Sequence, residues 1–270
     1  MKIIKVFLLI SLFSPITTLK ANNFQLGSRQ AAMGYTGVTH SDVWANFNNQ
    51  AGLANIKSTQ IGISGENRFL IPDLSNVGVA AAIPTKSGTF GINLSNFGNS
   101  SFAQTKIGIG FGKRFGNILS GGIQLNYLSI RLGENYGTAN VLSAELGLLA
   151  QPTKNLTVGA HIFNPNRAKI ADYANENLPT IMRLGINYKF SESVMIDSEI
   201  EKDISQKFIF KTGIEYHISK PIYLRVGIAT NSFLSTFGFG IEFNKLNLDF
   251  SSSYHSLLGY IPQLSITYGF

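Results

Sequence analysis

Apolar and polar residues alternate with a period of two from Ser58 to the C-terminus. In KIGIGFGK, residues 106–113, isoleucine and phenylalanine alternate with glycine, and in QLSITYGF, residues 263–270, apolar residues alternate with serine, threonine and glycine. Successive side chains of a β-strand point to opposite faces, so each segment presents one apolar face and one face of small, polar or charged residues. A soluble sandwich would carry more charge on its second face, where this chain often has glycine.

Such strands suit a β-barrel in a membrane, in which lipid covers the apolar face and the polar face lines the lumen. The pattern therefore predicts an all-β fold, a transmembrane antiparallel β-barrel of about fourteen strands of roughly ten residues each. An even number of strands returns both ends of the barrel to the same side. The predicted strands lie near residues 58–67, 75–84, 87–96, 103–114, 118–131, 138–150, 155–163, 180–190, 193–202, 207–218, 221–230, 234–243, 246–255 and 261–270.

Short and long connections alternate along this predicted barrel. Every second connection is short, namely residues 84–87, 114–117, 152–155, 191–193, 219–221 and 244–245. The other connections tend to be longer, namely 66–75, 132–138 and the longest, 164–178. Barrels of the bacterial outer membrane have short periplasmic turns and longer outer loops, so we expect the short turns and both termini on the periplasmic side.

Residues 1–21 have the features of a secretory signal peptide. Lys2 and Lys5 form a basic start, residues 6–18 are mostly apolar, and Ala21 offers a small residue for cleavage. Removing this segment with its three lysines lowers the formal charge from +7 to +4, which gives no case for binding nucleic acid. The chain has no cysteine, so its fold needs no disulfide. We expect an exported protein of the bacterial outer membrane, surrounded by outer-membrane lipid.

The sequence ends on an aromatic residue, Phe270, with Tyr268 two positions before it on an alternating strand. An aromatic end on the final strand resembles the signal by which the outer-membrane assembly machinery recognises its clients. We therefore expect that machinery to be a partner.

Residues 22–57 precede the first predicted strand and differ from it in character. The stretch GSRQAAMGYTGVTHSDVWANFNNQAGLA, residues 27–54, is rich in Gly, Ala and Asn and has almost no charge. Because a barrel of about fourteen strands is too wide for its own side chains to fill, we predict that residues 22–57 form a hatch inside the lumen of the barrel domain, residues 58–270. Ser28 and Ser41-Asp42 are the expected N-caps of two short helices. The predicted hatch residues are Gly27, Ser28, Arg29, Ala31, Ala32, Met33, Gly34, Asp42, Trp44, Asn46, Phe47, Asn48, Asn49, Ala51, Gly52 and Leu53.

Two groups of inward strand positions would receive this hatch. Glycines would leave room for it, namely Gly91, Gly108, Gly110, Gly122, Gly213, Gly227, Gly238 and Gly240. Charged residues would pair with each other or with the hatch, since buried charges are usually paired. These lumen charges are Asp197, Glu199, Lys211, Glu215, Arg225, Glu242 and Asp249. A substrate path is the alternative role for this charged group.

The stretch at 27–54 resembles the N-terminal motif of the PorV/PorQ proteins of Bacteroidetes-type bacteria. It resembles, more distantly, the hatch of the FadL-type fatty-acid transporters. Both families have a fourteen-stranded barrel with an N-terminal hatch. Their motif usually ends in an Asn-Pro-Ala-Gly-like step, where residues 49–52 of this chain have Gln in place of Pro. The resemblance to PorV-like proteins implies an accessory barrel of the type IX secretion apparatus.

An enzyme should show a nucleophile with its base, or a set of metal ligands. The four histidines are dispersed and lack metal-ligand spacing; they are His40, His161, His217 and His255. A lipid hydrolase built from Glu215, His217 and Ser251 or Ser253 is a minor alternative. We expect a protein that is not an enzyme and has no catalytic, cofactor or metal site, while a bound lipid or detergent is compatible with a barrel.

Two functions compete on this basis. The first, which we expect, is an accessory subunit of a secretion or assembly machine in the outer membrane, with a larger envelope protein as its partner. The alternative is a FadL-like channel for the uptake of hydrophobic small molecules. Such a channel needs a gap in its wall and an apolar pocket beside the hatch. Residues that could line this pocket are Phe24, Met33, Trp44, Phe47 and Leu53.

Overall fold

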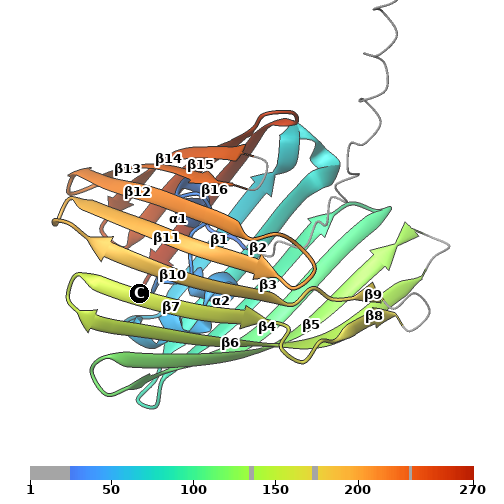
Figure 1. The fold of residues 1–270 in the computed structure, drawn as a ribbon, viewed down its shortest axis with the longest axis horizontal. Coiled ribbons are helices and arrows are strands. Elements are labelled where there is room, and N and C mark those ends of the chain that lie inside the picture. The colour runs from blue at the N-terminus through green and yellow to red at the C-terminus, as the bar shows by residue number, and fades with distance from the viewer. Residues whose placement is uncertain (1–24, 134–136, 172–175, 231–232) are drawn as a thin grey trace, which may run out of the picture.

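The computed structural model describes residues 25–133, 137–171, 176–230 and 233–270 (Figure 1). The predicted signal peptide, residues 1–21, lies outside the described residues. The helices are α1 (Ser28–Ala32), α2 (Ala45–Asn48) and the 3-10 helices η1 (Gln50–Asn55), η2 (Arg68–Leu70) and η3 (Pro72–Leu74). The strands are β1 (Gln60–Asn67), β2 (Ser75–Pro84), β3 (Thr89–Gly98), β4 (Phe102–Phe115), β5 (Leu119–Leu132), β6 (Thr138–Thr153), β7 (Leu156–Phe163), β8 (Lys169–Ala171), β9 (Glu176–Asn177), β10 (Ile181–Lys189), β11 (Val194–Asp203), β12 (Ile209–Ser219), β13 (Ile222–Ala229), β14 (Leu234–Phe243), β15 (Leu246–His255) and β16 (Gly259–Gly269).

Fourteen of the described strands form one closed antiparallel barrel, which confirms the predicted fold class. Strands adjacent in sequence are adjacent in the sheet, except that β8 and β9 form a separate two-stranded sheet and β7 pairs with β10. The first strand closes the barrel against the last, with Gln60 opposite Gly269 and Glu66 opposite Gln263. Each predicted strand matches an observed one to within a few residues at its ends.

Exposure alternates along the strands as the period of two requires. On β3, Asn93 and Ser95 are 1% and 3% exposed, whereas Ile92 and Leu94 between them are 48% and 43% exposed. The wall therefore carries an apolar outer face and a polar inner face, the arrangement that a barrel surrounded by lipid requires. Among the residues that the structure describes, no helix is long and apolar enough to cross a membrane.

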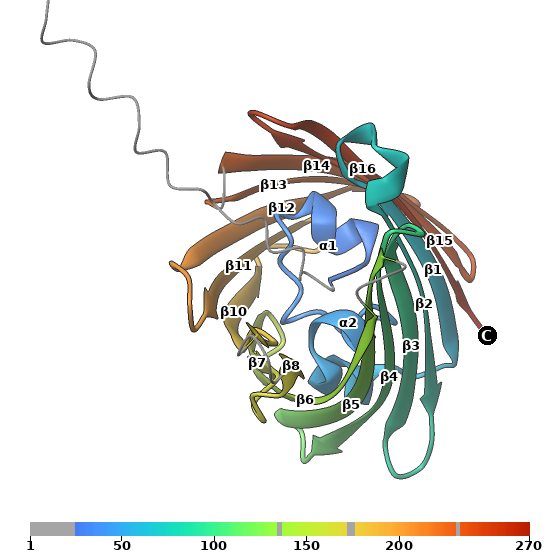
Figure 2. The same cartoon turned by 90° about the vertical axis from the view of Figure 1, so that its right-hand side faces the viewer.

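The segment from residue 25 to residue 57 lies inside the barrel. Figure 2 shows α1 and α2 within the ring of strands. An apolar core joins this segment to β2 and consists of Leu26, Val43, Trp44, Ala45, Phe47, Leu53, Ile56, Ala80 and Ala82. The burial of these side chains against the wall stabilises a segment whose own helices are too short to be stable alone. This is the hatch that the fold class includes.

The wall is lower at β7 and β10 than at β6. Strand β6 has 16 residues and β7 has 8, and their ladder ends where Glu145 lies opposite Phe163. Residues 138–144 of β6 therefore have no strand partner on that side among the described strands. The Asn166 side chain covers part of this edge, because it accepts a hydrogen bond from the Ala144 amide at 3.0 Å and donates one to the Leu142 carbonyl at 3.2 Å.

Candidate functional site

The 3-10 helix η1 lies against glycines on the inner faces of β3 to β6. A Cβ atom at Gly122 of β5 would collide with the main chain of Gln50, and a Cβ at Gly147 of β6 would collide with the Asn49 side chain. A larger residue at either position would push η1 away from the wall, so this close approach requires glycine. Five of the predicted inward glycines face the hatch in this way, namely Gly91, Gly122, Gly213, Gly227 and Gly238, while Gly108, Gly110 and Gly240 face mainly side chains of the wall.

Helix α1 and the turn after it lie against the opposite side of the wall. Gly34 has a φ of +73°, and a Cβ there would lie 2.7 and 2.8 Å from the carbonyl oxygens of Ile228 and Thr212. The Gly34 amide donates to the Thr236 hydroxyl at 2.9 Å, and that hydroxyl donates to the Ala32 carbonyl at 2.8 Å. Main-chain contacts with β12 to β14 therefore hold this end of the hatch.

Neither predicted helix cap is an N-cap in the structure. Ser28 is the first residue of α1 and Gly27 is the cap residue, so the prediction of Ser28 as an N-cap is wrong. The Ser28 amide instead donates to the Ser265 hydroxyl of β16 at 3.2 Å, a tertiary contact that replaces a local cap. The N-cap of α2 is Trp44, so the prediction of Ser41-Asp42 as the second cap is also wrong. Asp42 instead accepts a hydrogen bond from the Trp44 amide at 2.9 Å, in the turn before α2.

Amide side chains of the hatch bind the wall. Asn46 donates to the Ala81 carbonyl of β2 at 3.1 Å, and Asn49 donates to the Leu148 carbonyl of β6, also at 3.1 Å. Gln50, which stands where the related motifs have proline, begins η1 and donates to the Glu145 carboxylate at 2.8 Å. Arg29 and Asp42 are partly exposed. The other predicted hatch residues are buried, namely Gly27, Ala31, Ala32, Met33, Phe47, Asn48, Ala51, Gly52 and Leu53.

Most of the predicted lumen charges bind the hatch or each other. Arg29 of α1 donates two hydrogen bonds to Glu215, at 2.8 and 2.9 Å. Arg225 lies 2.7 Å from the same carboxylate and 2.6 Å from Asp249. Burial lowers the pKa of the Arg29 guanidinium, but the charges of Glu215 and Asp42 raise it by more, so the pKa lies above its ordinary value and Arg29 stays charged.

Two carboxylates of β11 hold the segment between α1 and α2. Asp197 lies 2.9 Å from His40 Nε2, and Glu199 accepts hydrogen bonds from the amides of Gly37 and Val38 at 2.9 and 3.1 Å. The remaining predicted charges lie on the wall: Lys211 pairs with Glu199 and Glu201, and Glu242 accepts a hydrogen bond from the Tyr223 hydroxyl at 2.8 Å.

Sequence reasoning missed a second group of buried charges. Glu145 of β6 lies 2.6 Å from Lys106 of β4 and 2.9 Å from His161 of β7. All three are less than 5% exposed and occupy inward positions. Lys106 has the same strand parity as Gly108 and Gly110, so the alternation itself could have identified it.

Apolar side chains also gather inside the lumen, toward the end with the long loops. The cluster consists of Leu128, Val141, Phe163, Leu178 and Ile181, with Ala168 and Ile170 packed against it. The Lys106 ammonium lies 5.5 Å from the centre of the Phe163 ring and 5.9 Å from that of Phe47 in the hatch. Lys106 therefore lies between this apolar cluster and the hatch.

Three residues of the alternative hydrolase, Glu215, His217 and Ser253, are engaged in other contacts. Two arginines occupy Glu215, while His217 stacks on Tyr223 with 4.2 Å between ring centres and Ser253 bonds to the Tyr35 hydroxyl at 3.3 Å. Within the described residues there is no group of three or more His, Asp or Glu side chains that could hold a metal ion.

Comparisons with known proteins give a clear likeness in fold. No protein-family model and no curated protein sequence matches the chain. The solved structure of the CymD monoaromatic hydrocarbon channel is similar with a TM-score of 0.71 at 13% identity, over 92% of this chain and 98% of that one. The Ralstonia pickettii toluene transporter TbuX gives 0.72 at 14% identity, over 92% and 99%. A Pseudomonas aeruginosa FadL homologue gives 0.65 at 11% identity, over 92% and 100%. The chain therefore has a FadL-like barrel fold.

This finding overturns the expected role as an accessory subunit of a secretion or assembly machine. That interpretation depended on a motif of residues 27–54 and on short connections. The structural likeness covers 92% of the chain, and the proteins it identifies are a hydrocarbon channel and a toluene transporter. The motif was misleading because its small and amide residues serve to pack a hatch against a wall, which barrels of different function share.

Proposed function

We propose that the protein is an outer-membrane channel for the uptake of small hydrophobic molecules. The observation that carries this proposal is the likeness in fold, over nine-tenths of the chain, to barrels named as a hydrocarbon channel and a toluene transporter. A PorV/PorQ kinship remains a prediction from the motif at residues 27–54.

The proposed location in the outer membrane fits the surface of the barrel. Outward apolar residues cover the wall, and the short turns, with both ends of the barrel sheet, would face the periplasm. Tyr268 and Phe270 point outward, 43% and 59% exposed, with their rings 5.0 Å apart. The Phe270 amide bonds to the Thr59 carbonyl at 2.9 Å. These terminal aromatics would be available to the assembly machinery before the barrel closes.

The apolar cluster inside the lumen supports this function. These apolar residues stabilise the fold by packing against each other, and they would also favour an apolar solute over water or ions, at about 25 cal/mol per Å² of buried apolar surface. A hydrophobic solute that enters among the long loops would have to displace Ala168 and Ile170, which pack against the cluster, before it reaches Val141 and Phe163. Lys106, Glu145 and the hatch lie beyond this cluster, so onward passage requires these groups to move.

An uptake assay with two adjacent residues of β6 tests the proposal. Val141 points into the cluster and is 4% exposed, whereas Leu142 points outward and is 72% exposed. Cells that lack their own hydrocarbon channels and express this protein should take up labelled toluene faster than cells with an empty vector. Val141→Ser should slow uptake about tenfold, because the hydroxyl must be desolvated against an apolar solute.

Leu142→Ser is the matched control and should leave uptake unchanged at equal amounts of folded protein in the membrane. Uptake no faster than with the empty vector would contradict the proposal. Equal effects of the two substitutions would show that the lumen cluster is not on the path.

A further inference from the structure

Exposed cations surround the end of the barrel with the short turns. Figure 1 shows these turns at one end of the barrel and β8 and β9 at the other. Every short turn of the described barrel has a lysine or arginine in the turn or near the end of a flanking strand, and one more lysine precedes β1. We call these residues the basic rim, and all of them are exposed: Lys57, Lys86, Lys113, Arg114, Lys154, Lys189, Lys220 and Lys245.

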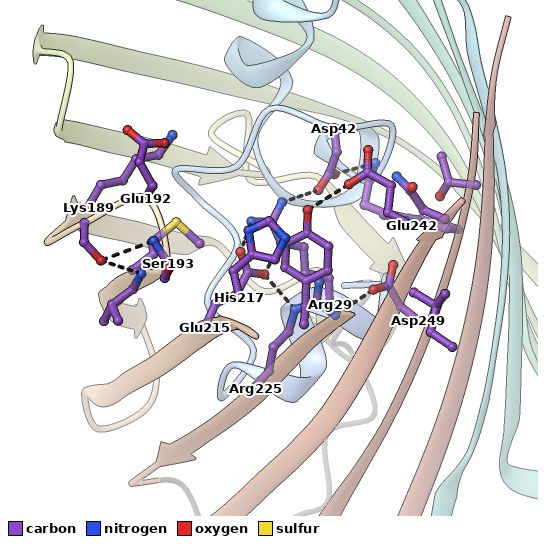
Figure 3. Close-up of a pocket in the computed structure, with 18 of the residues that line it drawn as sticks. Arg29, Asp42, Lys189, Glu192, Ser193, Glu215, His217, Arg225, Glu242 and Asp249 are labelled. Atoms are coloured by element: carbon purple, nitrogen blue, oxygen red, sulfur yellow. Dashed lines mark hydrogen bonds and ion pairs between the residues drawn. The ribbon is translucent and has the colours of Figure 1, made fainter. Parts of the chain in front are cut away.

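Acidic residues of the protein do not neutralise the basic rim. No member of the rim forms an ion pair with another described residue. The exposed acids at this end of the described chain are Glu192 and Glu242, which lie on opposite sides of the cavity that opens there (Figure 3). The eight cations of the rim therefore outnumber the two exposed carboxylates beside them.

The connections at the opposite end carry no such excess of positive charge. In the sequence they contain six basic and six acidic residues. The basic residues are Arg68, Arg131, Arg167, Lys169, Lys202 and Lys207, and the acidic residues are Glu66, Asp73, Glu134, Asp172, Glu176 and Asp203. The excess of cations is therefore specific to the end with the short turns.

Outward aromatic rings lie beside the basic rim. Five of them are 43% to 68% exposed, namely Phe115, Phe190, Phe243, Tyr268 and Phe270. Three rim cations, Arg114, Lys189 and Lys245, lie within two residues of one of these rings in the sequence. Aromatic residues on the outer face of a membrane barrel mark the boundary between the hydrocarbon and the lipid headgroups. Two residues of strand span only about 7 Å, so long basic side chains can reach the headgroups from these positions.

The rim cations are close enough together to act as one surface. Successive short turns are two strands apart, which is roughly 10 Å around the barrel. This distance is close to the Debye length of about 8 Å at physiological ionic strength, so the potentials of neighbouring turns overlap. A continuous positive ring at the membrane boundary suits a surface of many anionic groups, as an anionic lipid leaflet presents.

We propose that the basic rim binds the headgroups of anionic phospholipids, such as phosphatidylglycerol, in the leaflet that surrounds the short turns. The ammonium and guanidinium groups of the rim donate hydrogen bonds to the phosphate oxygens, and the aromatic rings pack against the acyl chains next to them. The proposal goes beyond the uptake of hydrophobic molecules, because it concerns the outer surface of the barrel and holds whatever the lumen accepts.

Spin-labelled lipids measure this preference in a membrane. The purified protein is reconstituted in phosphatidylcholine vesicles with a trace of spin-labelled phosphatidylglycerol or phosphatidylcholine of the same acyl chains. Electron paramagnetic resonance then gives the fraction of each labelled lipid that is held at the protein surface. At about 0.01 M salt we expect phosphatidylglycerol to associate about fivefold more strongly, the factor for roughly one lysine contact per lipid. At about 1 M salt, where the Debye length is about 3 Å, the two lipids should associate equally.

A variant with fewer rim cations tests the assignment to this end of the barrel. Its preference for phosphatidylglycerol should fall to about twofold or less, and its substitutions are Lys86→Gln, Lys113→Gln, Lys154→Gln, Lys220→Gln and Lys245→Gln. The control variant loses the same charge at the opposite end and should keep the full preference; its substitutions are Arg131→Gln, Arg167→Gln, Lys169→Gln, Lys202→Gln and Lys207→Gln.

Three results would each overturn the proposal. The unaltered protein could hold the two lipids equally at low salt, or its preference could persist at about 1 M salt, and neither measurement depends on a variant that must fold. The third result is that the rim variant retains the preference, or that the control variant loses it to the same extent.

Discussion

Contacts between individual residues explain why a hatch with almost no charge stays inside the barrel. The wall has glycine at several positions where η1 approaches it, and a Cβ atom at Gly112, Gly122 or Gly147 would collide with atoms of the hatch. Such contacts depend on the absence of one carbon atom. A single substitution of one of these glycines should therefore disturb the contact between the hatch and the wall.

Gly122→Ala should displace η1, because the added Cβ would collide with the main chain of Gln50. Overpacking of this kind costs about 1–3 kcal/mol, which should appear as a lower unfolding temperature in detergent. Gly65→Ala is the control, since a Cβ at Gly65 of β1 meets no atom within 4 Å. Equal unfolding temperatures for the two variants would show that η1 moves away from Gly122 at no cost.

At the scale of elements, the sequence could predict the strands and the position of the hatch but not how the strands meet around the lumen. The period of two identifies each strand and its inward face by itself. The triad of Lys106, Glu145 and His161 depends on which residues of three strands lie level with one another, and the stagger of the closed barrel sets this. The sequence also led us to prefer the accessory subunit over the uptake channel, because the motif at residues 27–54 specifies how a hatch packs and not what the lumen accepts.

The edge of β6 is an element that only the structure could reveal. The Asn166 side chain occupies the position of a strand partner there, because it forms hydrogen bonds with the Ala144 amide and the Leu142 carbonyl. Asn166→Ala should leave the barrel folded but speed the exchange of the Ala144 amide hydrogen severalfold, since that amide loses its side-chain partner. Hydrogen exchange read by mass spectrometry measures this. Asn117→Ala, in the short turn after β4, is the control. Unchanged exchange at Ala144 would mean that Asn166 does not protect this edge.

For the whole molecule, the wall forms the barrel and the hatch fills its lumen. The lumen of a barrel of about fourteen strands is wider than its own side chains can fill. The inward glycines of this barrel have no side chains and leave still more of the lumen free. The hatch occupies that space and is tied to opposite sides of the wall, through Gln50 and Glu145 on one side and Arg29 and Glu215 on the other. The wall should therefore fold without the hatch, while the hatch cannot be ordered without the wall.

Deletion of residues 27–54 tests this division of roles. The strand ladder should survive, because fourteen described strands pair in a closed ring whose main-chain hydrogen bonds do not pass through the hatch, and circular dichroism should still show β-structure. The emptied lumen should conduct ions, so single channels in planar bilayers should open with a conductance well above that of the intact protein. Asp197→Asn, which loosens the tie to His40 and keeps the hatch, should give at most brief openings. If the deletion variant conducts no better than the intact protein, the lumen is closed by the wall or its loops, and a solute would not need the hatch to move.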